Sequence, residues 1–416
     1  MLTGNLDREG GAMFARAAAA QKNSSGNGGG GKGVRLGRWD SRVRGLPEMF
    51  GELPVSCLAE EIETPGDGQV RALITLAGNP VVSTPNAGRL EQAIEGLEFQ
   101  LAIDLYVNET TRHADVVLPA PQPLERSHFD LAFYQLSVRN VANYSPAVFE
   151  GAGPAEWELL LRLAGVVSGQ WPSADVAAID DLVISTLVQR EVTMAGSPVE
   201  GRDPAELMEE LEPRRGPERI LDFMLRVGPY RLTLDELERH PHGIDLGAHR
   251  PRIPEMLRTP SGKVELAPES IVADLERLRP ELDRRRNGDM VLIGRRQLRS
   301  NNSWMHNLPA LVKGKDRCTL HIHPDDAERL GLEDGGRASV SSAAGRIEAP
   351  VELTDGIMPG VVSIPHGWGH DAPGVRMRVA SEHAGVNSNV LADETRVDPV
   401  SGNAVLNGIP VEIAPG

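Results

Sequence analysis

In the first third of the chain, short apolar runs alternate with a segment whose apolar positions recur at helical spacing. Residues 70–76 (VRALITL), 100–105 and 116–118 are apolar runs that predict buried strands. Residues 87–97 place leucine, alanine and isoleucine side chains on one face, which predicts a helix. Because strand, helix and strand in succession are typical of a βαβ unit, we expect an α/β layer with a parallel sheet.

Residues 154–285 follow a different pattern, with apolar positions at helical spacing among many charged residues, and predict a series of helices. Within them, residues 259–266 (TPSGKVEL) predict a turn that leads into a strand. Near the start of the chain, residues 23–33 (NSSGNGGGGKG) predict a flexible glycine-rich loop.

From about residue 288 the pattern changes to short strands. Residues 337–342 and 346–353 alternate between polar and apolar positions around an Ala-Gly turn, and residues 360–364 follow as another strand. These spacings predict a small β-barrel. We therefore expect an α/β domain over residues 1–285 and a β-barrel domain over residues 286–416.

Polar residues stand at or just after the ends of the predicted strands, namely Asn79, Asp104 and Glu125. Ligands of parallel sheets bind beyond the carboxyl ends of the strands, so each of these residues is a candidate ligand contact. An aspartate at a strand end is also a common helix cap, and an asparagine between glycine and proline also suits a turn. Arg126 has a plain interpretation as a surface charge, and these alternatives stay open at this point.

The segment 294–306 (GRRQLRSNNSWMH) contains three arginines, a glutamine and two asparagines. A strand or helix needs no such density of hydrogen-bond donors. Arginine binds phosphate through two parallel hydrogen bonds, and side-chain amides recognise the edges of rings. The segment therefore predicts a loop around a large, polar, phosphorylated cofactor.

Composition narrows the class of function. A net charge of −16 argues against general nucleic-acid binding. The two cysteines, Cys57 and Cys318, imply no disulfide framework and are too few for an iron–sulfur cluster, which normally takes four. The beginning of the chain does not resemble a signal peptide, and no apolar run approaches the roughly 20 residues of a membrane helix. We expect a cytoplasmic protein without nucleic-acid or membrane partners.

Histidines offer an alternative chemistry. His366 and His370 are four residues apart, a spacing that could place both on one zinc ion if they lay on a helix. Two glycines separate them, however, and a proline precedes them, so the segment predicts a loop. A zinc hydrolase is therefore the least favoured interpretation. The sequence contains no Gly-x-Ser-x-Gly nucleophile motif.

Several long passages occur in one order along the chain and resemble a known family. They are TGNLDREGGAMF, LITLAGNPVVSTPN, LAIDLYVNETTRHADVVLPAPQPLER, TPSGKVEL, the stretch from GRRQLRSNNSWMHN to IEAPVEL, MPGVVSIPHGWGH and GVNSNVLADETRVDPVSGNAVLNGIPVEI. They resemble the C-terminal part of the large subunit of molybdopterin-dependent oxidoreductases of the dimethyl sulfoxide reductase class, which includes formate dehydrogenases and nitrate reductases.

The resemblance implies a partial Rossmann-like parallel-sheet layer followed by a six-stranded β-barrel of the double-psi type. It also implies the cofactor bis(molybdopterin guanine dinucleotide) around molybdenum or tungsten. The residues that match cofactor contacts of the family are Asn79, Ile103, Asp104, Thr110, Arg126, Gly294, Arg295, Arg296, Gln297, Arg299, Asn301, Asn302, His366, Asn387 and Asn407.

The family's cysteine cluster for an iron–sulfur centre and its metal ligand have no counterpart in this sequence. We therefore expect no catalytic or metal-ligating residue here, and a truncated or split large subunit that is inactive alone. Its partner would be a missing N-terminal half or an iron–sulfur subunit, and its substrate a small molecule. The alternative is a non-catalytic, stand-alone cofactor-binding module.

Overall fold

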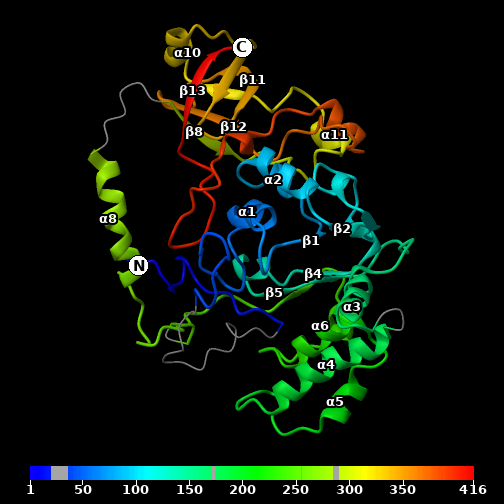
Figure 1. Cartoon of the computed structure of the whole chain (residues 1–416). Coiled ribbons are helices and arrows are strands. Elements are labelled where there is room, and N and C mark those ends of the chain that lie inside the picture. Colours follow the sequence, from blue (N-terminus) through cyan, green and yellow to red (C-terminus); the bar gives the residue numbers. More distant parts are fainter. Residues whose placement is uncertain (20–35, 171–173, 254, 284–289) are drawn as a thin grey trace. The chain divides into compact units, whose positions relative to one another are not determined.

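The computed structural model describes residues 1–19, 36–170, 174–253, 255–283 and 290–416 (Figure 1). The chain forms two compact units. Unit 1 comprises Met1–Val34 and Ala120–Leu266, and unit 2 comprises Arg35–Pro119 and Ala267–Gly416. These units divide the chain differently from the predicted domains, whose boundary between residues 285 and 286 stays a prediction. The glycine-rich loop predicted at 23–33 lies outside the described residues.

Unit 2 contains the predicted α/β layer. A three-stranded parallel sheet has the order β1-β2-β3, so the expected parallel sheet is confirmed. One cluster of buried apolar residues, including Ile62, Leu90 and Ile94, joins the helices to β1. The elements of this layer are α1 (Leu58–Glu63), β1 (Ala72–Leu76), α2 (Ala87–Glu95), β2 (Phe99–Asp104) and β3 (Val116–Pro119).

A closed six-stranded barrel makes up the rest of the unit, as the sequence predicts, in the order β10-β11-β9-β12-β8-β13. Its interior is filled by aliphatic side chains such as Leu320, Val340 and Ile364. The strands are β8 (Met290–Arg295), β9 (Leu320–Ile322), β10 (Arg337–Ser341), β11 (Arg346–Leu353), β12 (Val361–Pro365) and β13 (Ile409–Pro415). The helices of this part are α8 (Glu269–Asp283), α9 (Pro309–Val312), α10 (Pro324–Leu330) and α11 (Arg378–Glu382).

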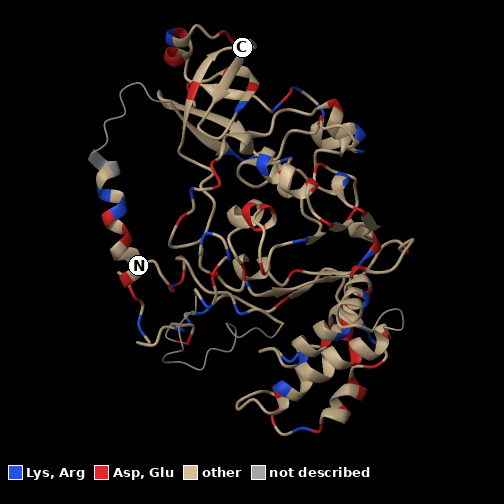
Figure 2. Ribbon diagram, in the orientation of Figure 1, with Lys and Arg blue, Asp and Glu red and all other residues tan. Residues whose placement is uncertain are grey.

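Unit 1 is mainly helical. Basic and acidic residues are interspersed along its helices (Figure 2), and the buried guanidinium of Arg219 pairs with Asp181 and Glu212. Its helices are α3 (Glu156–Val167), α4 (Val176–Val192), α5 (Pro204–Glu210), α6 (Gly216–Arg226) and α7 (Leu234–Glu238). Short antiparallel pairs join β4 (His128–Phe129) to β6 (Tyr144–Ser145) and β5 (Val141–Ala142) to β7 (Ile244–Asp245).

One local prediction was wrong. Residues 259–266 form turns and bends and contain no strand, although all eight are described. The valine and leucine of this segment alternate with polar residues, but no strand within the described ranges pairs with them. Among the described residues, no helix is both long enough and apolar enough to cross a membrane.

Candidate functional site

The arginine-rich segment forms a loop that leaves the end of β8 and lines a cavity of about 390 Å³ in unit 2. The residues that line it are Arg296, Gln297, Leu298, Ser300, Asn301, Asn302, Met305 and His366. Five of the predicted contact residues therefore meet around one cavity. The guanidinium of Arg296 donates a hydrogen bond to the side-chain oxygen of Asn302.

The tip of this loop has an unusual backbone. Asn301 and Asn302 have φ angles of 43° and 59°, the left-handed region that asparagine tolerates better than most residues. Within the described part of the chain, the main-chain N–H groups of Asn301, Asn302 and Ser303 donate to no protein acceptor. Such N–H groups, together with a guanidinium, suit an anionic ligand.

Arg295 and Gly294 have contacts within the barrel. The guanidinium of Arg295 donates to the main-chain oxygens of Ser363 at 3.0 Å, Thr319 at 3.0 Å and Arg317 at 3.2 Å. Burial lowers the pKa of this guanidinium. The N–H of Gly294 donates to the side-chain oxygen of Asn407 at 2.8 Å. These predicted contact residues hold the barrel and the loop together.

Arg299 is exposed and does not line the cavity in unit 2. It therefore stands apart from the five predicted residues that meet there.

Two of the predicted residues of the α/β layer, Asn79 and Thr110, form a hydrogen bond with each other. Asn79 accepts a hydrogen bond from the hydroxyl of Thr110 at 2.8 Å and donates one to Glu109 at 2.6 Å. Ile103 and Thr110 have no exposed surface. Asp104 ends β2 and accepts hydrogen bonds from the N–H of Tyr106 and the amide of Asn108, each at 3.1 Å.

Burial raises the pKa of Asp104, whereas the hydrogen bonds that the carboxylate accepts oppose this shift. A carboxylate has about four acceptor positions, so Asp104 keeps capacity for a ligand donor.

Two barrel residues complete the predicted set in unit 2. Asn387 donates to the main-chain oxygen of Val81 at 2.9 Å and accepts from the N–H of Asn389 at 3.0 Å. His366 lines the cavity, and burial followed by the charge of Arg296 lowers its pKa. Asn387 therefore connects the barrel with the α/β layer, whereas His366 faces the loop.

A buried chain of hydrogen bonds beneath the loop was not anticipated from the sequence. Ser300, His306, His370 and Glu109 follow one another at 2.8 Å in each step, and the ring of Trp368 stacks on His306 at a centroid distance of 3.9 Å. Both nitrogens of His370 are thus occupied, which leaves none to share a zinc ion with His366. The described residues contain no group of three or more histidine, cysteine or carboxylate side chains arranged for a metal ion.

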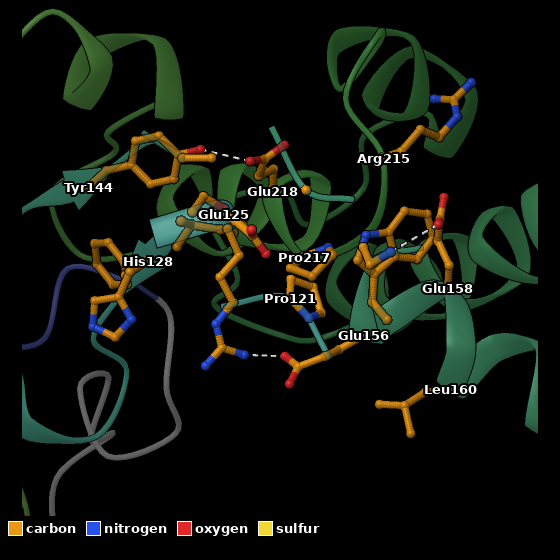
Figure 3. Close-up of a pocket in the computed structure, with 18 of the residues that line it drawn as sticks. Pro121, Glu125, His128, Tyr144, Glu156, Glu158, Leu160, Arg215, Pro217 and Glu218 are labelled. Carbon is orange, nitrogen blue, oxygen red and sulfur yellow. Dashed lines mark hydrogen bonds and ion pairs between the residues drawn. The ribbon is translucent and has the colours of Figure 1, made fainter. Parts of the chain in front are cut away.

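Arg126, the remaining predicted residue, belongs to unit 1. It lines a second cavity, of about 820 Å³, and forms an ion pair with Glu156. Figure 3 shows Glu156 at this cavity, with the hydroxyl of Tyr144 pointing to Glu218. That hydrogen bond is 2.8 Å long, and burial raises the pKa of Tyr144 to about 12.

The carboxyl end of a parallel sheet and a cavity with a few polar groups are places where ligands commonly bind. Two family models match the sequence: "Molybdopterin oxidoreductase" over residues 1–149 and "Molydopterin dinucleotide binding domain" over residues 290–410. The chain therefore belongs to the molybdopterin oxidoreductases, and its homologues are enzymes of the dimethyl sulfoxide reductase family.

The relatives agree on this family. A tetrathionate reductase subunit of Salmonella typhimurium is 37% identical over 123 residues, which are 26% of this chain and 12% of that protein. The assimilatory nitrate reductase catalytic subunit of Bacillus subtilis is 32% identical over 109 residues, which are 26% of this chain and 15% of that protein. Dimethyl sulfoxide/trimethylamine N-oxide reductase of Rhodobacter capsulatus is 24% identical over 361 residues, which are 77% of this chain and 39% of that protein.

The fold is similar to that of acetylene hydratase from Pelobacter acetylenicus, with a TM-score of 0.59 and 20% sequence identity. The similarity covers 87% of this chain and 46% of that chain. The matched regions cover less than half of each of these proteins.

Proposed function

We propose that this chain binds the guanine dinucleotide part of a molybdopterin cofactor, and that the cavity at the loop 295–306 takes the cofactor's phosphates. The observation that carries this proposal is the convergence of Arg296, Gln297, Asn301, Asn302 and His366 on one cavity. A pyrophosphate needs several donors and at least one positive charge, and this donor set fits that requirement.

The remaining predicted residues have supporting roles in this proposal. Asp104, at the carboxyl end of β2, is the acceptor for a ribose hydroxyl or a guanine edge. Arg295, Gly294 and Asn407 fix the loop on the barrel through the hydrogen bonds described above. When bound, the cofactor's molybdenum or tungsten would supply oxygen-atom or hydride-equivalent transfer, and the protein supplies binding and orientation.

We further propose that the catalytic unit is a larger oxidoreductase of the formate dehydrogenase and nitrate reductase type. Its metal ligand and iron–sulfur cluster would be carried by polypeptide outside these 416 residues, and this chain alone would be inactive. The similarity to the assimilatory nitrate reductase catalytic subunit of Bacillus subtilis and to a tetrathionate reductase subunit supports the oxidoreductase type. The stand-alone binding module is the second candidate, favoured by a cavity that lies wholly within unit 2.

The test is cofactor retention. The chain and its variants are expressed in a host that makes the cofactor, and bound pterin is measured by fluorescence after oxidation, beside metal content. Losing one charge-assisted hydrogen bond weakens binding by about tenfold or more. We expect this for Arg296→Ala and for Asp104→Ala, whereas Arg378→Ala, a change at an exposed arginine of the same unit, serves as the matched control. Cofactor bound in equal and measurable amounts by all four proteins, alone or with the added polypeptide described below, would refute the assignment.

The same preparations separate the two candidates. Cofactor held tightly by the chain alone, without further polypeptide, supports the binding module. Cofactor held only after addition of a polypeptide that carries the cysteine cluster supports the larger enzyme.

A further inference from the structure

The hydrogen-bonded chain beneath the loop runs without interruption from the cavity to the α/β layer. Ser300 lines the cavity, and its hydroxyl lies 2.8 Å from Nε2 of His306. Nδ1 of His306 lies 2.8 Å from Nε2 of His370, and Nδ1 of His370 lies 2.8 Å from Oε1 of Glu109. All four residues are buried and all belong to unit 2. The amide of Asn79 donates to the second carboxylate oxygen of Glu109.

The carboxylate of Glu109 determines the direction of the first step. Burial acts to raise its pKa, but hydrogen bonds from His370 and Asn79 and the charge of His370 lower it overall. An ionised carboxylate only accepts hydrogen bonds, so Nδ1 of His370 carries a proton and donates it. The state of the other ring nitrogens then depends on the protonation of His370.

When His370 is neutral, its Nε2 is an acceptor. Nδ1–H of His306 then donates to it, Nε2 of His306 is an acceptor, and the hydroxyl of Ser300 must donate to that nitrogen. The hydroxyl proton of Ser300 therefore points to His306 and away from the cavity. Toward the cavity, Ser300 offers lone pairs alone and suits an N–H or O–H donor of a ligand.

When His370 carries a second proton, both hydrogen bonds of His306 reverse, whereas Nδ1–H of His370 still donates to Glu109. Nε2–H of His370 donates to His306, and Nε2–H of His306 donates to Ser300, whose own proton is free to point into the cavity. One proton enters from the cavity in this change: Ser300 receives it, passes its own to Nε2 of His306, and the Nδ1 proton of His306 moves to His370. No other bond forms or breaks.

The geometry favours a positive charge on His370, whose Nδ1 lies 2.8 Å from the carboxylate of Glu109, over His306, which bonds to Ser300 and His370. Burial, with further contributions from His370 and His366, lowers the pKa of His306 to about 3. His306 is enclosed by Trp368 and His370, whereas His370 lies against the carboxylate of Glu109. His306 therefore stays neutral in both states and changes only which nitrogen carries its proton. The titratable neighbours are His366 and His370 for His306, and Glu109 and His306 for His370.

We propose that Ser300 is a specificity-determining contact of the cavity, and that His306, His370 and Glu109 are positioning residues that set whether its hydroxyl accepts or donates. A neutral relay favours a ligand donor at Ser300, and a protonated relay favours an anionic phosphate oxygen. The role of Ser300 toward phosphate depends on the proposed function, but the relay itself does not.

The relay is tested without any ligand. The whole chain is labelled with ¹⁵N in its histidine rings, and long-range ¹H–¹⁵N spectra identify the protonated nitrogen of His306 between about pH 8 and about pH 5. We expect Nδ1–H at the alkaline end and conversion to Nε2–H on acidification, without a signal of doubly protonated His306. A His306 ring that keeps one tautomer throughout, or that becomes doubly protonated, overturns the relay.

A variant of Glu109 tests whether the carboxylate controls the tautomer of His306. Glu109→Gln keeps an acceptor for His370 but removes the negative charge that stabilises its protonated ring. We expect the tautomer conversion of His306 to move to lower pH or to vanish. The wild-type titration stands by itself if this variant does not fold.

Binding of guanosine diphosphate mannose tests the role of Ser300, because its pyrophosphate diester and guanosine resemble the dinucleotide and do not titrate in this pH range. Between about pH 8 and about pH 5.5, we expect the affinity of the wild type to rise more than that of Ser300→Ala, by a factor on the order of five. His366→Asn measures how much of the rise comes from the other histidine of the cavity.

The outcomes separate the role of Ser300 from the proposed phosphate site. Tautomer conversion with equal pH dependence in wild type and Ser300→Ala overturns the specificity role of Ser300. Tautomer conversion without any binding of guanosine diphosphate mannose overturns the proposed phosphate site and leaves the relay standing.

Discussion

Arg295 distinguishes a residue that supports the site from one that binds the ligand. Its guanidinium donates to three main-chain oxygens, of which Ser363 belongs to β12 and Thr319 directly precedes β9. Because Arg295 itself ends β8, one side chain joins three barrel strands at the base of the loop. Replacement by methionine keeps the length and apolar stem of the side chain but removes every donor.

The loss of stability in Arg295→Met follows from these hydrogen bonds. A hydrogen bond to a charged group contributes about 1.5–3 kcal/mol, so three such bonds give a gross loss of roughly 6 kcal/mol. One effect reduces this loss. Burial lowers the pKa of Arg295, which means that the buried charge is itself unfavourable, and methionine removes that penalty. We expect a net destabilisation of about 3 kcal/mol.

Hydrogen–deuterium exchange followed by mass spectrometry measures this loss where it occurs. About 3 kcal/mol corresponds to roughly a hundredfold faster exchange of amides in β8 and β12, if the barrel opens in a cooperative step. Arg296→Met is the matched control, because this exposed arginine has no hydrogen-bond partner outside the loop among the described residues, and we expect a change of at most about 0.5 kcal/mol. Unchanged exchange in Arg295→Met, combined with weaker binding of guanosine diphosphate mannose, would refute the supporting role and make Arg295 a ligand contact.

Three further predictions follow from the packing and charges. Gly367→Ala places a Cβ 2.5 Å from the main-chain oxygen of Asn302, at a φ of 89°, and should lower stability by about 2 kcal/mol or more and disturb the loop, as measured by thermal unfolding. Gly216→Ala places a Cβ 2.6 Å from the ring of Trp157, at a φ of 55°, and should destabilise unit 1 and shift tryptophan fluorescence. Hydrogen bonds from a lysine and a threonine lower the pKa of Glu352 to about 2. The ionised carboxylate therefore contributes fully to stability above about pH 4.5, and this contribution is lost as the pH falls through about 2. Glu352→Gln should be less stable than wild type at about pH 6 and equal to it near pH 2.

Matched glycines control the first two changes. Gly408 and Gly201 also have positive φ angles, but no atom lies within 4 Å of the added Cβ. Their alanine variants should lose only the roughly 1–2 kcal/mol of backbone strain. Equal losses at the crowded and the open glycine of either pair would contradict the packing argument. For Glu352→Gln, a stability difference from wild type that persists unchanged to about pH 2 would show that charge is not its cause.

Local patterns predicted much of the fold. The apolar run 70–76 contains β1, and the segment 346–353 is β11. These elements depend on side-chain spacing and on backbone preferences that neighbouring residues carry. The segment 259–266 shows the limit of such patterns, because a strand needs a partner strand and the sequence does not say whether one is present.

Part of the candidate site could be predicted because some of its residues are neighbours in sequence. Arg296, Gln297, Asn301 and Asn302 are close in sequence, so their density could be recognised before the structure was known. Glu109, by contrast, is separated from its relay partners in the barrel by about two hundred residues or more, and no spacing links them. Single histidines and glutamates carry no signal that they will meet in a buried chain.

The sequence by itself determined that this protein has an α/β layer, a barrel and a loop rich in arginine and amide side chains, because each depends on residues near one another in the chain. Only the tertiary structure decided how those side chains are used. Folding directs Arg295 into the barrel and Arg296 toward the cavity, although they are neighbours in sequence. It also joins Ser300 to Glu109 through two histidines. The physical reason is that hydrogen bonding and burial depend on which distant segments pack together. Those segments come into contact only when the sheet and the barrel form.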